Sequence, residues 1–229
     1  MRFPSPISYV GDKRVKKEKQ TKQHIQGHNN SQQEAQRQVM SFLIGLGILF
    51  ASFVAFFVLQ QETVQRTYIY PYHYKEWVEK YSQQYHVDPY LVAAVIKTES
   101  KFQHNVQSSH GAIGLMQLMP ETAQWIAEQM EEKDFVIQHL AEPEVNIRFG
   151  IWYLHILDQE FHGNEVLVLA AYNAGIGNVR HWMETKGWNY DFQDEEDIPY
   201  LETREYVRSV LKNQQKYYKL YPPKEVPSN

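Results

Sequence analysis

The residue best suited to acid–base chemistry is Glu99, which lies where an apolar residue is expected. In Pro89–Ser100 an apolar stripe of Val92, Val95 and Ile96 recurs at helical spacing, and Glu99 is its next member. Burial disfavours the charged form of a carboxyl group, and the partial negative charge at a helix C-terminus opposes ionisation further. The pattern predicts a raised pKa and an acid able to protonate a leaving oxygen, as glycosidic bond cleavage requires. A buried glutamate held by structural hydrogen bonds is the alternative.

A second group of polar residues follows in the segment Ser108–Gln117. Gly111 and Gly114 bracket apolar residues, so the chain is expected to turn tightly and to approach another backbone closely. Met116 and Gln117 then supply a polarizable side chain and an amide, which donates and accepts hydrogen bonds together. An amide suits recognition of an acetamido sugar, and it equally suits the capping of a helix.

Two more motifs lie further along the chain. Ala170–Gly175 contains Tyr172 and Asn173 beside small residues, which let a helix end pack closely while presenting a ring and an amide. Ile198–Val207 places Glu202 at the expected start of a helix, where the helix dipole favours a carboxylate. Packing of small residues and capping by Glu202 are the structural alternatives.

The elements that must position these residues are helices. Tyr74, Val78, Tyr81 and Tyr85 recur at spacings of three and four, and Asp88-Pro89 is typical of a helix N-cap followed by a first-turn proline. Further helices are expected from near Pro120, from near Pro143, over Asn164–Asn173 with Gly175 as a left-handed cap, and from about Glu202 to Lys219. No stretch shows sustained strand alternation, so the predicted fold class is mainly α.

Taken together, the four motifs resemble the catalytic domain of the soluble-lytic-transglycosylase-like family, glycoside hydrolases with a goose-type lysozyme fold. The matching elements, in family order, are Glu99-Ser100, Gly111-Ala112-x-Gly114-Leu115-Met116-Gln117, Ala171-Tyr172-Asn173-Ala174-Gly175 and Pro199-x-x-Glu202-Thr203-x-x-Tyr206-Val207. The resemblance covers roughly residues 74–218. Gln103-His104 departs from it, because a proline is common there.

The resemblance implies a lysozyme-like multi-helix domain with a substrate cleft, acting on peptidoglycan glycan strands. It implies cleavage of the β-1,4 bond between N-acetylmuramic acid and N-acetylglucosamine without water, which leaves a 1,6-anhydro-muramoyl end. Its implied roles are Glu99 as general acid and then base, Ser108 as the residue that orients it, Met116, Gln117, Tyr172 and Asn173 as glycan contacts, and Glu202 and Tyr206 as supporting residues. It implies no metal and no cofactor.

Two other functions stay open at this point. A lysozyme-like muramidase would use water in the final step, positioned by Glu121, Glu142 or Glu144. A catalytically silent peptidoglycan-binding scaffold would need no acid, and an intact Glu99 argues against it. Cell-wall or secretion machinery stays open as a partner.

An uncharged apolar run over residues 40–59 has about the length that a helix needs to cross a bilayer. A secretory signal peptide would have a shorter apolar region followed by small residues, and a buried core helix would show a polar stripe. The expected organisation is a disordered basic tail over residues 1–39, a transmembrane helix over 40–59 in contact with lipid, a juxtamembrane connector over 60–70, a catalytic domain over 71–221 and a C-terminal tail over 222–229.

Charge predicts the orientation of this span. Residues 1–39 hold eight Lys or Arg against three Asp or Glu, a net charge of +5, whereas residues 60–229 carry a net charge of −9. Because positive flanks stay inside, a single-pass protein with a cytoplasmic N-terminus and an extracytoplasmic domain is expected. An acidic domain is a poor nucleic-acid binder, and the absence of cysteine excludes thiol catalysis and cysteine-ligated metals.

Overall fold

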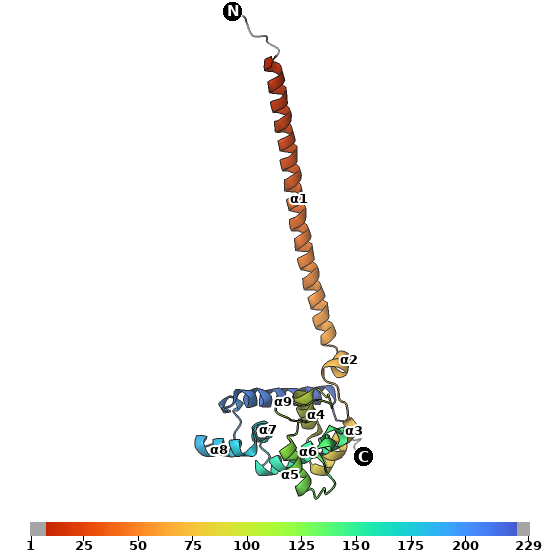
Figure 1. Ribbon diagram of the computed structural model, residues 1–229, viewed down its shortest axis with the longest axis vertical. Coiled ribbons are helices and arrows are strands. Elements are labelled where there is room, and N and C mark those ends of the chain that lie inside the picture. The colour runs from red at the N-terminus through yellow and green to blue at the C-terminus, as the bar shows by residue number, and fades with distance from the viewer. Residues whose placement is uncertain (1–7, 224–229) are drawn as a thin grey trace, which may run out of the picture. The chain divides into compact units, whose positions relative to one another are not determined.

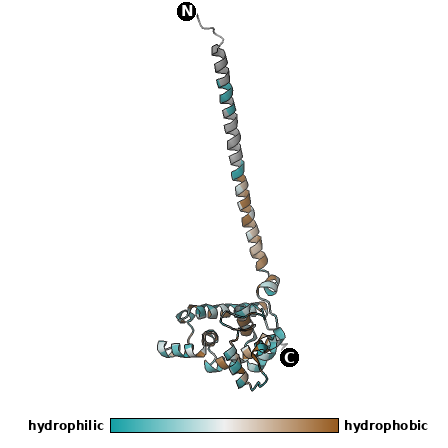
Figure 2. Cartoon of the chain, viewed as in Figure 1, coloured by the Kyte–Doolittle hydropathy of each residue, from teal (hydrophilic) through white to brown (hydrophobic). Residues whose placement is uncertain are grey.

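A computed structural model describes residues 8–223, and the chain divides between Gln61 and Glu62 into two units. The first unit consists of one helix, α1 (Ser8–Leu59). Within α1 the 24 residues Gln36–Leu59 are apolar enough and long enough to cross a membrane, and most of them form the brown stretch of this helix in Figure 2. This candidate span begins four residues before the expected one, with the polar residues Gln36, Arg37 and Gln38 at its start.

Residues 8–39 differ from the expectation, because the structure continues α1 through a segment for which the sequence predicts a disordered tail. The segment is rich in Lys, Gln, Arg and Glu, which have good helix propensity. Nucleation is the costly step of helix formation, and a helix already formed by the apolar run extends with one hydrogen bond per added residue. Positions 1–7 of the expected tail and 224–229 of the expected C-terminal tail lie outside the described residues.

The regular elements of the second unit are all helices. Its elements are α2 (Glu62–Val64), the π-helix η1 (Gln65–Ile69), α3 (Lys75–Tyr85), α4 (Pro89–Ser100), α5 (Pro120–Gln129), the 3₁₀ helix η2 (Ile137–Ala141), α6 (Pro143–Glu160), α7 (Glu165–Ala174), α8 (Ile176–Lys186), the 3₁₀ helix η3 (Glu195–Asp197) and α9 (Leu201–Leu220). Within residues 8–223 no strand forms, although Ile113 makes isolated antiparallel bridges to Gln107 and Leu118. The mainly α prediction is confirmed.

Prolines and polar caps begin the helices as predicted. Pro89, Pro120 and Pro143 each occupy the first turn of a helix, where a missing N–H breaks no hydrogen bond. The Asp88 carboxylate accepts hydrogen bonds from two backbone N–H groups at the start of α4, at 3.0 and 3.1 Å. Asn164 caps α7 in the same way. These signals are local, which is why they can be read in the sequence.

The helix α8 was not predicted, because Gly175 alone separates it from α7. Gly175 has φ 90° and ψ 145°, which is not the left-handed conformation expected of it. This extended conformation with positive φ is accessible almost only to glycine, and it lets one helix end and another begin within one residue.

The core surrounds α4, whose residues Val92, Val95 and Ile96 have no exposed surface. This helix packs against α9 and α3 (Figure 1). A smaller apolar cluster lies under α5, and two rings, Tyr153 and Tyr172, pack against both clusters. The junction of the two clusters therefore lies beside the helix that carries Glu99.

Residues 62–70 are part of the second unit, whereas a connector was expected over residues 60–70. Tyr221 Oη donates hydrogen bonds to the carbonyl oxygens of Arg66 and Tyr70, at 3.2 and 2.9 Å. The Lys97 ammonium group of α4 donates to the Ile69 carbonyl and lies 4.7 Å from the centre of the Tyr70 ring. The fold thus begins near Glu62, because aromatic residues from the C-terminus of α9 cover this segment.

Candidate active site

Glu99 lies in the last turn of α4, and its side chain is half-buried. Loss of solvent on burial is the largest effect on its carboxyl group, and the pKa rises from 4.5 to about 7. Hydrogen bonding to the Tyr206 hydroxyl opposes part of this rise, and the negative charge of Glu202 adds to it. The raised pKa expected from the apolar stripe is therefore present, and Glu99 carries a transferable proton near neutral pH.

Tyr206 and Glu202 approach Glu99 from the beginning of α9. The Tyr206 side chain is buried, and burial followed by the charge of Glu99 raises the pKa of its hydroxyl well above the usual range. Apart from Glu99, Tyr206 Oη has no hydrogen-bond partner among the described residues. Glu202 is exposed in the first turn of the helix. The structure thus brings together the three residues that the family resemblance places near one another.

Tyr172, on α7, is a further residue near Glu99. Its hydroxyl donates a hydrogen bond of 2.8 Å to the backbone carbonyl of Met116. Burial is the main cause that raises the pKa of this hydroxyl well above its usual range, followed by the charge of Glu99. Asn173, the next residue, is half-buried in the last turn of the same helix. Glu99 therefore lies near two tyrosine side chains, both of them neutral.

Ser108 begins the loop that leads to Gln117. Its Oγ accepts hydrogen bonds from the backbone N–H groups of His110 and Ala112, at 3.2 and 3.0 Å. Its backbone N–H donates to the Ala112 carbonyl at 2.9 Å, so the residue closes the turn containing Gly111. No hydrogen bond between Ser108 and Glu99 forms among the described residues, in contrast to the expected orienting role. The Ser108 oxygen already accepts two hydrogen bonds from N–H groups of the turn. Its hydroxyl proton is the one atom left with which Ser108 can bind Glu99.

The Met116 and Gln117 side chains differ in what they offer a ligand. Met116 is fully buried and packs against Gly150, so its expected contact with a glycan is not available to the side chain in this structure. Gln117 is half-buried, and its Nε2 donates to the carbonyls of Gly114 and Val106, at 2.8 and 3.1 Å. The backbone therefore holds the amide nitrogen of Gln117, and its carbonyl oxygen is the atom that can accept a hydrogen bond from a ligand.

Asn146 is a supporting residue that the sequence analysis missed. It is fully buried in α6, its Oδ1 accepts from the Met116 N–H at 2.8 Å, and its Nδ2 donates to the Ile113 and Leu140 carbonyls at 2.9 and 3.0 Å. A Cβ atom on Gly114 would lie 2.3 Å from Asn146 Nδ2, so glycine is required for this approach. The available signal was a polar residue directly before the apolar stripe of that helix.

Residues 76–194 match the family model described as the transglycosylase SLT domain. The chain belongs to this family. The matched residues run from α3 to the segment before η3 and include Glu99, the Ser108–Gln117 loop and Tyr172, while Glu202 and Tyr206 lie beyond the match.

Curated relatives of this SLT domain chain include soluble and membrane-bound proteins. The soluble lytic murein transglycosylase of Salmonella typhimurium is 36% identical over 144 residues, which cover 62% of this chain and 22% of the relative. The membrane-bound lytic murein transglycosylase C of Edwardsiella ictaluri is 30% identical over 173 residues, which cover 63% of this chain and 46% of the relative. The chain thus spans about a fifth of the length of its soluble relatives.

Solved structures share the fold of this SLT domain. The 70 kDa soluble lytic transglycosylase of Escherichia coli superposes with a TM-score of 0.63 at 32% identity, covering 68% of this chain and 25% of that one. A complex of the 70 kDa soluble lytic transglycosylase with bulgecin A gives a TM-score of 0.63 at 31% identity, covering 70% of this chain and 26% of that one. The lysozyme-like fold implied by the sequence motifs is confirmed.

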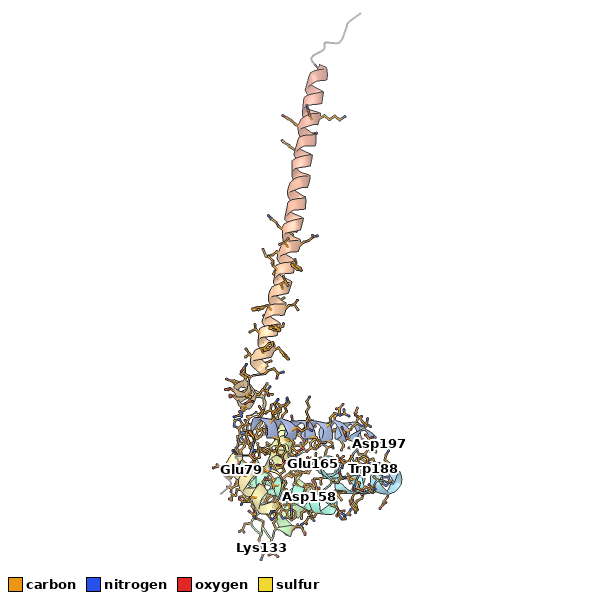
Figure 3. The ribbon with its side chains drawn as sticks, turned by 180° about the vertical axis from the view of Figure 1, so that it is seen from behind. Glu79, Lys133, Asp158, Glu165, Trp188 and Asp197 are labelled. Atoms are coloured by element: carbon orange, nitrogen blue, oxygen red, sulfur yellow. The ribbon has the colours of Figure 1, made fainter. Side chains whose placement is uncertain are left out.

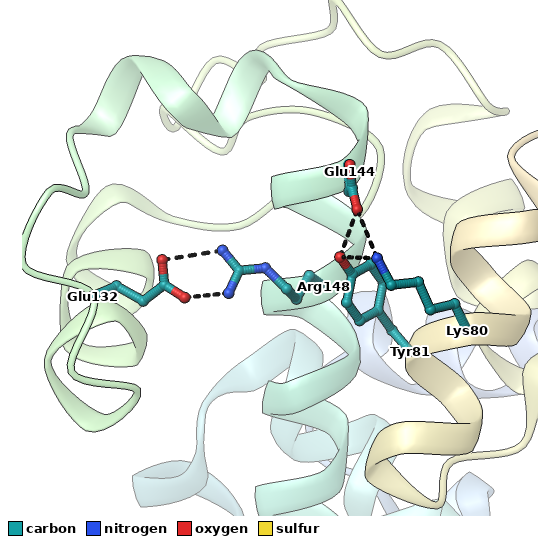
Figure 4. A network of polar contacts seen from close by, with 5 residues as sticks. All are labelled: Lys80, Tyr81, Glu132, Glu144 and Arg148. Atoms are coloured by element: carbon teal, nitrogen blue, oxygen red, sulfur yellow. Dashed lines mark hydrogen bonds and ion pairs between the residues drawn. The ribbon is translucent and has the colours of Figure 1, made fainter.

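Glu144, one candidate for positioning water in this SLT domain, forms hydrogen bonds with residues of α3 instead. Tyr81 Oη donates to its carboxylate at 2.6 Å and Lys80 Nζ at 3.1 Å, and these hydrogen bonds lower the pKa of Glu144 (Figure 4). Beside them Arg148 forms a bidentate pair with Glu132. This network joins α3 to α6 at the surface, so Glu144 is a structural residue here.

A second carboxyl group of the SLT domain, Glu165, also has its pKa raised by burial and then by the charge of Asp88. It is labelled in Figure 3 and begins α7, about two turns before Tyr172. It therefore lies apart from the Glu99 site. The structure describes no group of three or more His, Asp or Glu side chains that could hold a metal ion within residues 8–223.

Proposed function

We propose that this chain is a membrane-anchored peptidoglycan lytic transglycosylase with Glu99 as its catalytic acid and base. The observation that carries the proposal is a half-buried carboxyl group with a pKa of about 7, flanked by Tyr172 and Tyr206. A group with this pKa gives up and takes back a proton at neutral pH with little cost in either direction. Membership of the transglycosylase SLT domain family supports peptidoglycan as the substrate.

The proposed reaction has two steps. Glu99 protonates the oxygen of the bond between N-acetylmuramic acid and N-acetylglucosamine, and that bond breaks while the acetamido group of the muramoyl sugar stabilises the electron-poor C1. The Glu99 carboxylate then takes the proton of the muramoyl 6-hydroxyl, whose oxygen bonds to C1 and closes the 1,6-anhydro ring. Glu99 ends protonated as it began. The hydroxyls of Tyr172 and Tyr206 keep their own protons in both steps, because their pKa values are far higher than that of Glu99. The carboxyl group is therefore the group that gives up and takes back the proton.

A muramidase would instead add water to C1, and the two reactions differ by the mass of one water per cut. Glu121 and Glu142 are exposed and Glu144 is held by Lys80 and Tyr81, so a transglycosylase is the better supported of the two. Mass spectrometry of muropeptides released from cell-wall sacculi tests the proposal. Products ending in 1,6-anhydro-muramic acid are expected, and products carrying the extra water would establish a muramidase.

We expect Gln117→Ala and Asn173→Ala each to weaken glycan binding while the fold is kept. Loss of one hydrogen bond to a neutral sugar group costs about 0.5–1.5 kcal/mol, or roughly two- to tenfold in affinity. The measurement is the dissociation constant for soluble glycan strands in a Glu99→Gln background, where no cleavage occurs. Asn178→Ala is the control, because the side-chain amide of this α8 residue makes one local hydrogen bond among the described residues, to the Ala174 carbonyl four positions earlier. Wild-type affinity in both variants would remove these residues from the cleft.

The proposed anchor is the apolar part of α1, with its N-terminal side in the cytoplasm and the SLT domain outside. The apolar stretch Gln36–Leu59 supports a span, the basic segment before it supports the orientation, and membrane-bound relatives support membrane association. Protease added outside cells whose outer surface is accessible should degrade the SLT domain and spare residues 1–35. Recovery of the domain free in the medium, beginning near residue 60, would identify a cleaved signal instead.

A further inference from the structure

A continuous series of aromatic rings leads from the Glu99 site to the surface. The ring of Tyr172, beside Glu99, lies 5.6 Å from that of Tyr153 on α6. The Tyr153 ring lies 6.2 Å from that of Trp125 on α5, with the two planes at 78°. Tyr153 and Tyr172 belong to the junction of the two apolar clusters, so their positions are fixed by packing on both sides. The series ends at Trp125, which is 38% exposed.

The exposed end of this series lines a surface pocket of about 310 Å³. Its lining consists of Glu121, Thr122, Trp125, Tyr153 and Ile176. One lining residue, Ile176, directly follows the Ala171–Gly175 motif that carries Asn173, so the pocket adjoins the helix end that holds a predicted glycan contact. Trp125 is supported from behind by Trp152, with ring centres 5.6 Å apart, which limits the positions its indole can adopt.

This composition fits the chemistry of a sugar ring. The face of an indole carries negative charge density, and it attracts the C–H groups on one face of a pyranose. The Glu121 carboxylate and the Thr122 hydroxyl beside it can accept and donate hydrogen bonds to ring hydroxyls. Glu121 is the charged residue of the lining, and its negative charge disfavours a sugar that carries a carboxylate, as unsubstituted N-acetylmuramic acid does.

We propose that this pocket is a distal glycan subsite in which an N-acetylglucosamine unit of the strand packs on the indole of Trp125. The inference rests on the proposed function, because it extends the same strand from Glu99 along Tyr172 and Tyr153 to the pocket. The subsite adds binding energy from a part of the substrate that does not react. It therefore favours long strands over short fragments that end before the pocket.

The test compares binding of long and short peptide-free glycan strands to the full chain in detergent. The Glu99→Gln protein is the parent, so that dissociation constants are measured without cleavage, by anisotropy of labelled strands. Trp125→Ala should bind long strands about tenfold more weakly and lose most of the preference for them, as for an aromatic anchor at an interface. Trp125→Phe keeps an aromatic face and should retain most of the affinity. Tyr68→Ala, which removes a 79% exposed ring from η1, should bind as the parent does.

Each outcome decides the inference. Equal affinity of Trp125→Ala and Tyr68→Ala for long strands would overturn it, as would a parent that binds long and short strands alike. If circular dichroism shows that Trp125→Ala does not fold, Trp125→Leu keeps the contact with Trp152 without an aromatic face and takes its place. Release of anhydro ends by the chain with Glu99 intact is scored separately. Its absence would overturn the proposed function, whereas its presence with unaltered binding by Trp125→Ala would overturn the subsite alone.

Discussion

Replacement of Glu99 by glutamine is expected to lower the rate of strand cleavage by at least about 10²–10⁴-fold, the usual contribution of general acid–base catalysis. Glutamine keeps the size and hydrogen-bonding capacity of the side chain but has no acidic proton. Because one residue serves as acid and then as base in the proposed reaction, both steps lose their catalyst. The measurement is the initial rate of anhydro-muropeptide release, together with glycan affinity, which should be retained.

The pKa of Glu99 adds a second signature to this experiment. The rate of the parent should fall as pH rises above about 7, because the proton that Glu99 must donate is then lost. Between pH 4.5 and about 7 the folded protein holds a proton that the unfolded chain has released. The free energy of unfolding therefore falls with rising pH across this range, by at most about 3 kcal/mol. Glu99→Gln should remove this dependence and be more stable than the parent at pH 8 but not at pH 4.

Tryptophan fluorescence can follow this stability in the full chain, because all five tryptophans lie after residue 61 and report on the second unit. A Glu99→Gln protein that releases anhydro ends at near-parent rates would overturn both the mechanism and the role of this residue. A scaffold protein would show the same glycan binding in both forms and no release in either. The pH dependence of unfolding tests the raised pKa of Glu99 independently of the mechanism. If that dependence is present but Glu99→Gln still cleaves strands, the mechanism is wrong and the pKa is right.

The sequence predicts those features that local chemistry determines. Pro89, Pro120 and Pro143 mark helix starts because proline suits the first turn whatever the rest of the chain does. The apolar stripe that ends at Glu99 predicts a raised pKa because burial alone penalises the charge. The motif order also places Glu202 and Tyr206 near Glu99, although they lie about a hundred positions further along. That placement came from the resemblance to a family and not from periodicity.

Features that depend on distant partners were missed or misjudged. Met116 is buried because Gly150, 34 positions later, leaves room for its side chain, and nothing near Met116 reveals this. The segment over residues 62–70 has little apolar pattern of its own, yet the hydroxyl of Tyr221, directly after α9, donates hydrogen bonds to two of its carbonyl oxygens. The Ser108 hydroxyl serves its own turn, a use that competes with the orienting role implied by the family.

The second large effect is expected from Asn146→Ala. The substitution removes one acceptor and two donors from the core. It leaves the Met116 N–H and the Leu140 carbonyl without these partners, whereas the Ile113 carbonyl keeps its hydrogen bond from the Leu118 N–H. An unsatisfied buried polar group costs about 1–3 kcal/mol, so a loss of about 3–5 kcal/mol in unfolding free energy is expected. The loop that carries Gln117 also loses its attachment to α6, so glycan affinity should fall in whatever fraction stays folded.

Unfolding in urea, followed by tryptophan fluorescence, measures this loss, and Asn178→Ala is again the control because its amide makes one local hydrogen bond. Asn146→Asp separates the two halves of the interaction. It keeps the acceptor for the Met116 N–H, but it places a carboxylate oxygen against two carbonyls. The folded state therefore favours the protonated acid, so the pKa of the new carboxyl group is raised. Relative to the parent at the same pH, Asn146→Asp should recover stability as pH falls, whereas Asn146→Ala should not. If Asn146→Asp is destabilised relative to the parent by the same amount at pH 4 and at pH 8, the amide acts by filling space and not by holding the loop through hydrogen bonds.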